Sequence, residues 1–313
     1  MAIGPLYRPI VEVVREAGVD VEAVIASQGL NCEQLFAAET RLAPDQGRAL
    51  GRALFRALPA GVDRSELGLK AAERFAARDA DLLGYILDQS AHPLAAVHAL
   101  TDYARLVGDS ADFRVHTANE QVSVVFALTG GKQMLPEAAD FAVAAIFRLL
   151  RDRTGGVVKP VAVHLPRPKP RTLRLFQRFF GLDVQFDAPA GTLIYERACM
   201  LLPFPHSDRR LGQLLEQHAV ERVRGLPPDG WQDRVRAIIA EGLSHGDCAL
   251  DSVAARCGVG ERTLRRRLSE TGTSYRALVD DVRRERALTL LELTDSISNV
   301  AQQLGFSDAT AFA

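Results

Sequence analysis

Two segments near the C-terminal end of the chain repeat one pattern of small and apolar residues, 47 positions apart. In each segment an Ala stands four residues before a Gly, and a small or apolar residue follows that Gly after six positions. The Ala lets a second helix approach closely, the Gly tolerates a left-handed turn, and the later residue packs the second helix onto the first. The pattern predicts two helix-turn-helix units, with the triplets Ala254, Gly258 and Leu264, and Ala301, Gly305 and Ala311.

Matching apolar positions flank both triplets and make the repeat more specific. One triplet alone is a weak signal, whereas two of them joined by a long helix are a strong one. A segment rich in helix breakers, residues 225–230, precedes the repeat and indicates a domain boundary. We therefore expect an all-α domain at 231–313 with two helix-turn-helix units, the second of which is cut off at Ala313.

The rest of the chain mixes helical and strand patterns. Strict alternation of apolar and polar residues predicts a hairpin over 113–128 that turns at Asn119 and Glu120. Helices combined with a small, mostly antiparallel sheet make an α+β domain, which we place at residues 1–206. Further strands are expected at 158–165, 184–186 and 192–195, and helices near 10–17, 21–27, 44–58, 66–76, 82–89, 93–107, 136–151 and 173–180.

Residues 207–230 are expected to form one helix and a linker. Ser207 is a candidate N-cap, and Leu211, Leu214 and Leu215 begin an apolar stripe that continues to Val223. The stripe fits either a dimer seam or packing of the helix onto its own domain, and a single amphipathic helix of this length commonly does the latter.

Around the repeat, the chain resembles the AraC/XylS family of bacterial transcription regulators. The linker helix carries Tyr275, Arg283, Arg286-Ala287 and Leu291 at the family's positions, and 297–308 is similar to the family signature. The N-terminal part resembles the sensing domain of the subgroup that includes ornithine- and arginine-responsive regulators. That likeness implies an α+β sensor rather than a cupin barrel, and it is carried by Leu83-Gly84-Tyr85, Asp140-Phe141-Ala142 and 178–186.

The resemblance implies a sequence-specific regulator that binds double-stranded promoter DNA, contacts RNA polymerase and forms a homodimer. Its N-terminal domain would take a small-molecule effector, such as an amino acid or another metabolite. An alternative is that this domain serves only for dimerisation or protein docking. In the family, a closing helix and a terminal motif follow the second recognition helix, so we expect the natural protein to extend beyond Ala313.

The first recognition helix is expected from about Glu261 to Leu268. Leu264 and Leu268 lie four positions apart and face the core, so Arg262, Arg265 and Arg266 project outward, where they would enter the major groove. An Arg side chain can bind guanine O6 and N7 with two hydrogen bonds, although a solvated basic face would show the same pattern. Arg267 lies nearer the core side, where a phosphate contact or an ion pair is expected. The candidate DNA contacts are Arg262, Thr263, Arg265, Arg266 and Arg267, with Ala309, Thr310 and Ala313 in the second unit.

Spacing alone does not locate an effector site. A polar residue on a mostly apolar helix is more often a satisfied structural group than a ligand contact. With that alternative in view, the candidate effector contacts are Tyr85, His92, His98, Tyr103, Arg105 and His164.

Composition and cysteine spacing limit the classes of function that the chain can have. The formal net charge is −1, so DNA binding rests on a local cluster of arginines rather than on overall charge. Cys32, Cys199, Cys248 and Cys257 lack metal-ligand spacing, which favours reduced thiols that fill apolar space. They supply neither the nucleophile nor the zinc cluster of the DNA-repair methyltransferases that carry this kind of helix-turn-helix. We expect no metal, no cofactor, no catalysis and no membrane span, and a cytoplasmic location.

Overall fold

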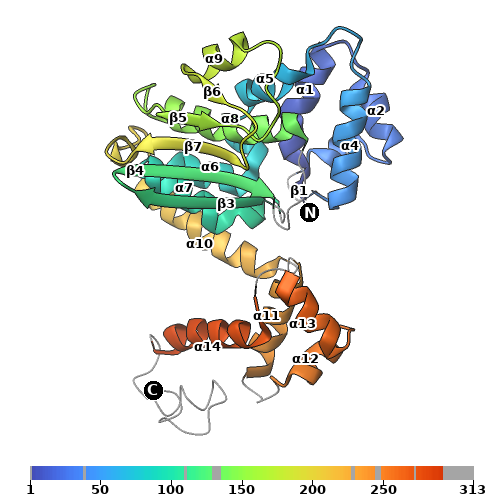
Figure 1. Cartoon of the computed structure of the whole chain (residues 1–313), viewed down its shortest axis with the longest axis vertical. Coiled ribbons are helices and arrows are strands. Elements are labelled where there is room, and N and C mark those ends of the chain that lie inside the picture. Colours follow the sequence, from blue (N-terminus) through green and yellow to red (C-terminus); the bar gives the residue numbers. More distant parts are fainter. Residues whose placement is uncertain are drawn as a thin grey trace. The chain divides into compact units, whose positions relative to one another are not determined.

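A computed structural model describes residues 2–37, 40–108, 111–128, 135–226, 230–243, 248–270 and 273–291 (Figure 1). The chain divides into two compact units, Met1–Gly225 and Leu226–Ala313. The first unit combines helices with a five-stranded sheet, and the described part of the second is helical. The predicted order of an α+β domain followed by an all-α domain is confirmed. No helix among the described residues is long and apolar enough to cross a membrane.

The sheet of the first unit has the strand order β3-β4-β7-β5-β6. β5 and β6 pair in parallel, and the other neighbours are antiparallel. The predicted hairpin forms: Asn119 and Glu120 have φ values of 48° and 60°, which suit a two-residue turn between twisted strands. The strands are β3 (Ala111–Ala118), β4 (Gln121–Leu128), β5 (Ala162–His164), β6 (Val184–Gln185) and β7 (Gly191–Glu196).

β5 is shorter than the strand expected at 158–165. The backbone N–H of Val158 donates to Thr154 Oγ1 at 3.2 Å, so this residue belongs to the turn that follows α8 instead of to the sheet. Pro160 has no N–H to give to a strand ladder. The strand therefore begins only at Ala162.

Helices cover the apolar face of the sheet. α7 (Pro93–Tyr103) contacts β3, and α8 (Pro136–Arg153) contacts β7. Val122, Val124, Leu193 and Tyr195 point into this layer and are almost fully buried. The strands that carry them alternate between buried and partly exposed positions, as expected of a sheet with one buried face. α6 (Asp81–Gln89) packs on α7, and α9 (Arg174–Phe180) contacts β6.

The N-terminal helices form a smaller cluster around the fully buried Leu50 and Leu54. Gly18 ends the first helix with a φ of 89°, as its position after the apolar stripe predicts. The two-residue strands β1 (Ala2–Ile3) and β2 (Arg41–Leu42) pair with each other and were not predicted. The helices are α1 (Arg8–Glu16), α2 (Val21–Ser27), the unpredicted α3 (Cys32–Leu35) and α4 (Pro44–Arg56).

α5 (Leu67–Arg74) and α8 pack at close range through a glycine. A Cβ at Gly68 would lie 2.3 Å from the carbonyl oxygen of Glu137 and 2.7 Å from Cβ of Asp140. Both distances are shorter than van der Waals contact, so the absence of a side chain at Gly68 sets the separation of the two helices.

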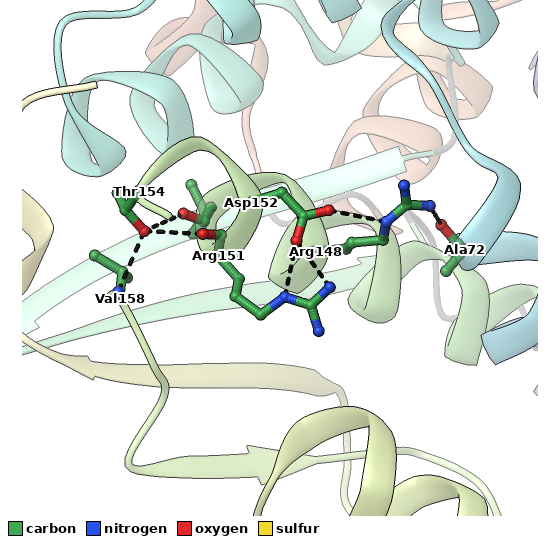
Figure 2. A network of polar contacts seen from close by, with 7 residues as sticks. Ala72, Arg148, Arg151, Asp152, Thr154 and Val158 are labelled. Carbon is green, nitrogen blue, oxygen red and sulfur yellow. Dashed lines mark hydrogen bonds and ion pairs between the residues drawn. The ribbon is translucent and has the colours of Figure 1, made fainter. Parts of the chain in front are cut away.

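Polar contacts fix the C-terminal end of α8 (Figure 2). Asp152 accepts hydrogen bonds from Arg148 Nε at 3.0 Å and from Arg151 Nε at 2.8 Å. Arg148 also donates to the carbonyl oxygen of Ala72 on α5, at 2.6 Å. Thr154 Oγ1 donates to the carbonyl oxygen of Leu150 and accepts from the N–H of Val158. These bonds hold α8 to α5 and terminate it where the chain leaves for β5.

α10 (Arg209–Gly225) packs against α6. Its N-terminus is capped by Asp208, whose carboxylate accepts from the N–H groups of Arg210 and Leu211, so the expected Ser207 cap is wrong. Ser207 is one residue too early and bonds instead to the carbonyl oxygen of Phe204. One side of α10 is buried at Ala219, whereas Leu214 is 58% exposed.

The second unit has its own core. α11, α13 and α14 contribute Val235, Ile239, Leu264 and Leu278, among others. Tyr275 opens α14 and donates a hydrogen bond to the carbonyl oxygen of Cys248 at 2.9 Å. The expected second helix-turn-helix, 297–313, lies outside the described residues. The helices are α11 (Gly230–Leu243), α12 (Leu250–Arg256), α13 (Glu261–Glu270) and α14 (Tyr275–Leu291).

Candidate DNA-binding helix and ligand cavity

α12, a tight turn and α13 form the first helix-turn-helix unit (Figure 1). Gly258 has a φ of 72°, and the N–H of Val259 bonds to the carbonyl oxygen of Ala254 at 3.0 Å. Ala254 and Leu264 are 1% and 0% exposed, because they fill the space where the two helices meet. All three residues of the first triplet occupy the positions that the sequence pattern predicts.

α13 separates its apolar and basic residues onto different faces. Leu264 and Leu268 are fully buried, whereas Arg262, Arg265 and Arg266 are exposed. Arg265 and Arg266 form long ion pairs along the helix, with Glu261 at 3.4 Å and Glu270 at 3.7 Å. Ion pairs between such exposed groups contribute little to stability, so both guanidinium groups can exchange them for another acceptor.

Arg267 is placed differently from its neighbours. Its guanidinium lies 4.0 Å from the centroid of the Trp231 ring on α11 and is half-buried. A cation over an indole face gains about 0.5–1 kcal/mol, or more when water is excluded. This stacking links α13 to α11 and gives Arg267 a structural partner. Thr263 is half-buried on the same helix, and the candidates of the second unit, Ala309, Thr310 and Ala313, lie outside the described residues.

The first unit contains a cavity of about 540 Å³. Its walls come from the N-terminal helices, α6, α7, the β3-β4 hairpin and α8. The rings of Phe113 and Phe126 stack with centroids 4.8 Å apart, and those of Phe75 and Phe141 meet edge to face at 5.7 Å. All four line the cavity. Its size lies within the range of about 300–1,000 Å³ typical of small-molecule sites.

Among the residues that the structure describes, three polar side chains line this cavity: Tyr7, Arg48 and Arg52. Arg48 and Arg52 lie one turn apart on α4, and both are exposed. Arg48 pairs with Asp45, whereas Arg52 forms no hydrogen bond or ion pair within the described part of the chain. Burial raises the pKa of Tyr7 to about 12, although the charge of Arg48 opposes the shift, so its hydroxyl remains a neutral donor.

None of the six effector contacts expected from the sequence is among the residues that line the cavity. His92 caps α7, where its Nδ1 accepts from the N–H of Ala95 at 3.1 Å, and His98 is exposed on the same helix. Tyr85 is 47% exposed on α6. The other three are half-buried: Tyr103 on α7, Arg105 in a 3₁₀ turn and His164 on β5.

Tyr7, Arg48 and Arg52 were missed because no motif carries them. On α4 the two arginines have the spacing of an ordinary solvated helix face, and Tyr7 lies about 40 positions away in sequence. Only the packing of α4 beside the N-terminal segment brings them to one cavity. No sequence motif indicates such an arrangement.

A buried ion pair joins α8 to the segment that follows β5. Arg167 forms a short ion pair with Asp140, which is fully buried, and donates to the carbonyl oxygen of Ser65 at 3.0 Å. Desolvation raises the pKa of Asp140 to about 7, and Arg167 opposes that shift. Because Arg167 also lies 5.5 Å from the ring centroid of Phe176, it joins three elements of the unit. This cluster is a structural device rather than part of the cavity wall.

The described residues show no group of three or more side chains suited to a metal ion. The four cysteines form no disulfide, and burial raises the thiol pKa of Cys32, Cys199 and Cys257. Thiols with a raised pKa stay protonated and are poor nucleophiles. The cysteines pack against the hydrophobic clusters of their units.

Residues 18–204 match the family described as the arabinose-binding domain of AraC transcription regulators, at the N-terminus, and residues 253–313 match a helix-turn-helix domain. The chain belongs to the AraC family of transcription regulators. It combines a sensor-like N-terminal domain with a DNA-binding C-terminal domain, as the resemblance implies.

Several regulators are similar to this AraC-family chain. The ornithine utilization regulator of Pseudomonas aeruginosa is 26% identical over 79% of this chain and 73% of its own length. The regulator VqsM of the same species is 41% identical over 20% of each chain, and the transcriptional activator NphR of Rhodococcus is 34% identical over 25% of this chain and 24% of its own. The crystal structure of the P. aeruginosa regulator CdpR aligns with a TM-score of 0.44 at 22% identity, covering 93% of this chain and 91% of that one. No conclusion follows from a TM-score this low.

Proposed function

We propose that this AraC-family regulator reads promoter DNA with Arg262, Arg265 and Arg266 of α13, under the control of a small molecule bound by its N-terminal unit. The observation that carries the proposal is the division of α13 into a buried leucine face and an exposed arginine face. Each well-placed Arg–guanine pair supplies about 1–3 kcal/mol of discrimination. Arg267, stacked on Trp231, acts through the position of α13 or on a phosphate.

We also propose which partners the regulator binds and where in the cell it acts. The regulator forms a homodimer, contacts RNA polymerase at its promoters, and works in the cytoplasm, where bacterial promoter DNA is found. It has no catalytic activity, in line with the transcription regulators to which it is similar. In the second unit, we expect Ala309, Thr310 and Ala313 to contact the DNA.

The decisive experiment starts with immunoprecipitation of the complete protein from its genome and a gel shift on the strongest fragment. Arg265→Ala and Arg266→Ala should each weaken binding to that operator by about fivefold to 150-fold at matched salt. Arg284→Ala removes a comparable exposed charge from α14 and serves as the control, with little expected change. Both α13 variants binding as tightly as the parent would refute the assignment.

A second candidate role for the N-terminal unit is dimerisation or protein docking without a ligand. The exposed Leu211 and Leu214 on α10 favour it. A ligand that binds the folded state raises the melting temperature. If no metabolite in a broad thermal-shift screen stabilises the protein, the ligand-free role gains support.

A further inference from the structure

The cavity of the N-terminal unit is mostly apolar, whereas the ligands named for the matching family and for one relative, arabinose and ornithine, are polar. Arabinose carries an oxygen on every carbon, and ornithine carries charged groups at both ends of a short methylene chain. A site for either therefore needs polar partners on more than one side of the ligand. Here Phe75, Phe113, Phe126 and Phe141 form much of the wall. An apolar wall leaves the polar groups of a sugar or an amino acid unpaired, at a large desolvation cost.

The charge at the cavity is positive and lies on the middle turns of α4. Arg48 and Arg52 are four residues apart, where two like charges repel each other along a helix. An anion between them would replace this repulsion with two charge-assisted hydrogen bonds. Arg52 has no competing partner within the described part of the chain, and Arg48 pairs there with the exposed Asp45. Tyr7 adds a neutral hydroxyl that can donate to the same anion.

We infer that the effector of this regulator is an amphipathic organic acid, with its apolar body in the cavity and its carboxylate at Arg48, Arg52 and Tyr7. This inference rests on the proposed role of the N-terminal unit as a sensor and narrows it to a class of ligand. The aromatic walls and the volume of about 540 Å³ accommodate an acyl chain or a ring system rather than a compact polar metabolite.

Calorimetric titration of the full chain with decanoate, 1-decanol, L-arabinose and L-ornithine tests the inference. Decanoate should bind, and 1-decanol should bind at least tenfold more weakly, because it lacks the charged group. Shortening the acid should weaken binding by about fourfold for each methylene removed from the cavity. The double variant Arg48→Gln/Arg52→Gln should lose at least tenfold for decanoate and little for 1-decanol.

Arg56→Gln is the matched control, since Arg56 lies one turn beyond Arg52 on α4 and does not line the cavity. Ala142→Leu, on the cavity wall of α8, should weaken decanoate and 1-decanol alike, with the unfolding midpoint checked for each variant. Equal binding of decanoate and 1-decanol would overturn the anionic head, and binding of arabinose or ornithine alone would overturn the ligand class.

The operator gel shift separates this inference from the proposed function. A protein that shifts its operator but binds no alkanoate refutes the ligand class and leaves the regulator role standing. A protein that binds decanoate through Arg48 and Arg52 but shifts no genomic fragment refutes the DNA assignment and leaves the cavity site standing.

Discussion

At the scale of single residues, Asp140 links burial to acidity. Its carboxyl is fully enclosed, and desolvation raises its pKa from 3.8 to about 7 despite the neighbouring Arg167. The folded protein therefore holds a proton there that the unfolded chain has already lost. Stability from this group is complete below about pH 4 and declines as the pH rises to about 7.

Urea unfolding from pH 4 to pH 8 measures this effect. We expect the free energy of unfolding to fall across the interval in the parent, and to fall less in Asp140→Asn, which has no carboxyl to titrate. Comparing the two slopes cancels the contribution of groups common to both proteins. Parallel slopes would show that Asp140 stays ionised in the fold.

Gly258 gives a second test at this scale. Its φ of 72° is costly for any residue with a Cβ, although a Cβ there would meet no atom within 4 Å. Gly258→Ala should destabilise the helix-turn-helix unit by about 1–2 kcal/mol through backbone strain alone. Gly258→Asn is the matched control, because Asn tolerates the left-handed region better than Ala does and should recover part of the loss. Similar losses in the two variants, measured by chemical denaturation, would contradict this account.

At the scale of elements, the end of α8 depends on one hydroxyl. Thr154 Oγ1 is buried and serves both the carbonyl oxygen of Leu150 and the N–H of Val158 (Figure 2). Thr154→Val keeps the shape but leaves the N–H of Val158 without an acceptor, so we expect a loss of about 1–3 kcal/mol. Thr154→Ser retains the hydroxyl and should recover most of that loss in the same thermal or urea unfolding assay. No difference between Val and Ser would refute the role.

The elements also show what a sequence can and cannot predict. Periodicity located α2, α6 and the β3-β4 hairpin, because each buries one regular face, and Asn119 and Glu120 marked the turn. It gave no sign of β1 and β2, whose pairing joins residues about 40 positions apart. Short strands held by such distant contacts carry too few residues to show a period.

At the scale of the whole molecule, the exposed side of α10 is a candidate surface for self-association of the protein. Leu211 and Leu214 are 43% and 58% exposed, while Ala219 on the same helix is fully buried. If the exposed side forms the dimer seam, Leu214→Glu should shift the protein from dimer to monomer in sedimentation experiments while its far-ultraviolet circular dichroism stays that of the folded chain. Its unfolding midpoint should fall, because the dimer no longer stabilises the folded state. Leu214→Met keeps the apolar surface and should remain dimeric. A dimer that persists in Leu214→Glu would place the seam elsewhere.

The sequence predicted the arginines of α13 but not the residues that line the cavity. The arginines proposed to contact DNA follow from a local pattern, because the buried Leu264 and Leu268 fix which side of α13 is exposed. The cavity is assembled from segments across the first 150 residues, and its polar end, Tyr7, Arg48 and Arg52, emerges only from tertiary packing. Residues that come together from distant segments form no motif with a characteristic spacing in the sequence.

The close packing at Gly68 has a consequence for how the specificity of the proposed effector cavity would change over evolution. Because the backbone of α8 is held against α5 on one side, its other side can exchange Ala142, Ile146 or Leu149 without moving the helix. New specificities can then arise one substitution at a time on a fixed frame. A side chain at position 68 would act as a wedge and disturb every wall position together, so a library built to retune this protein as a biosensor should vary α8 and keep that glycine.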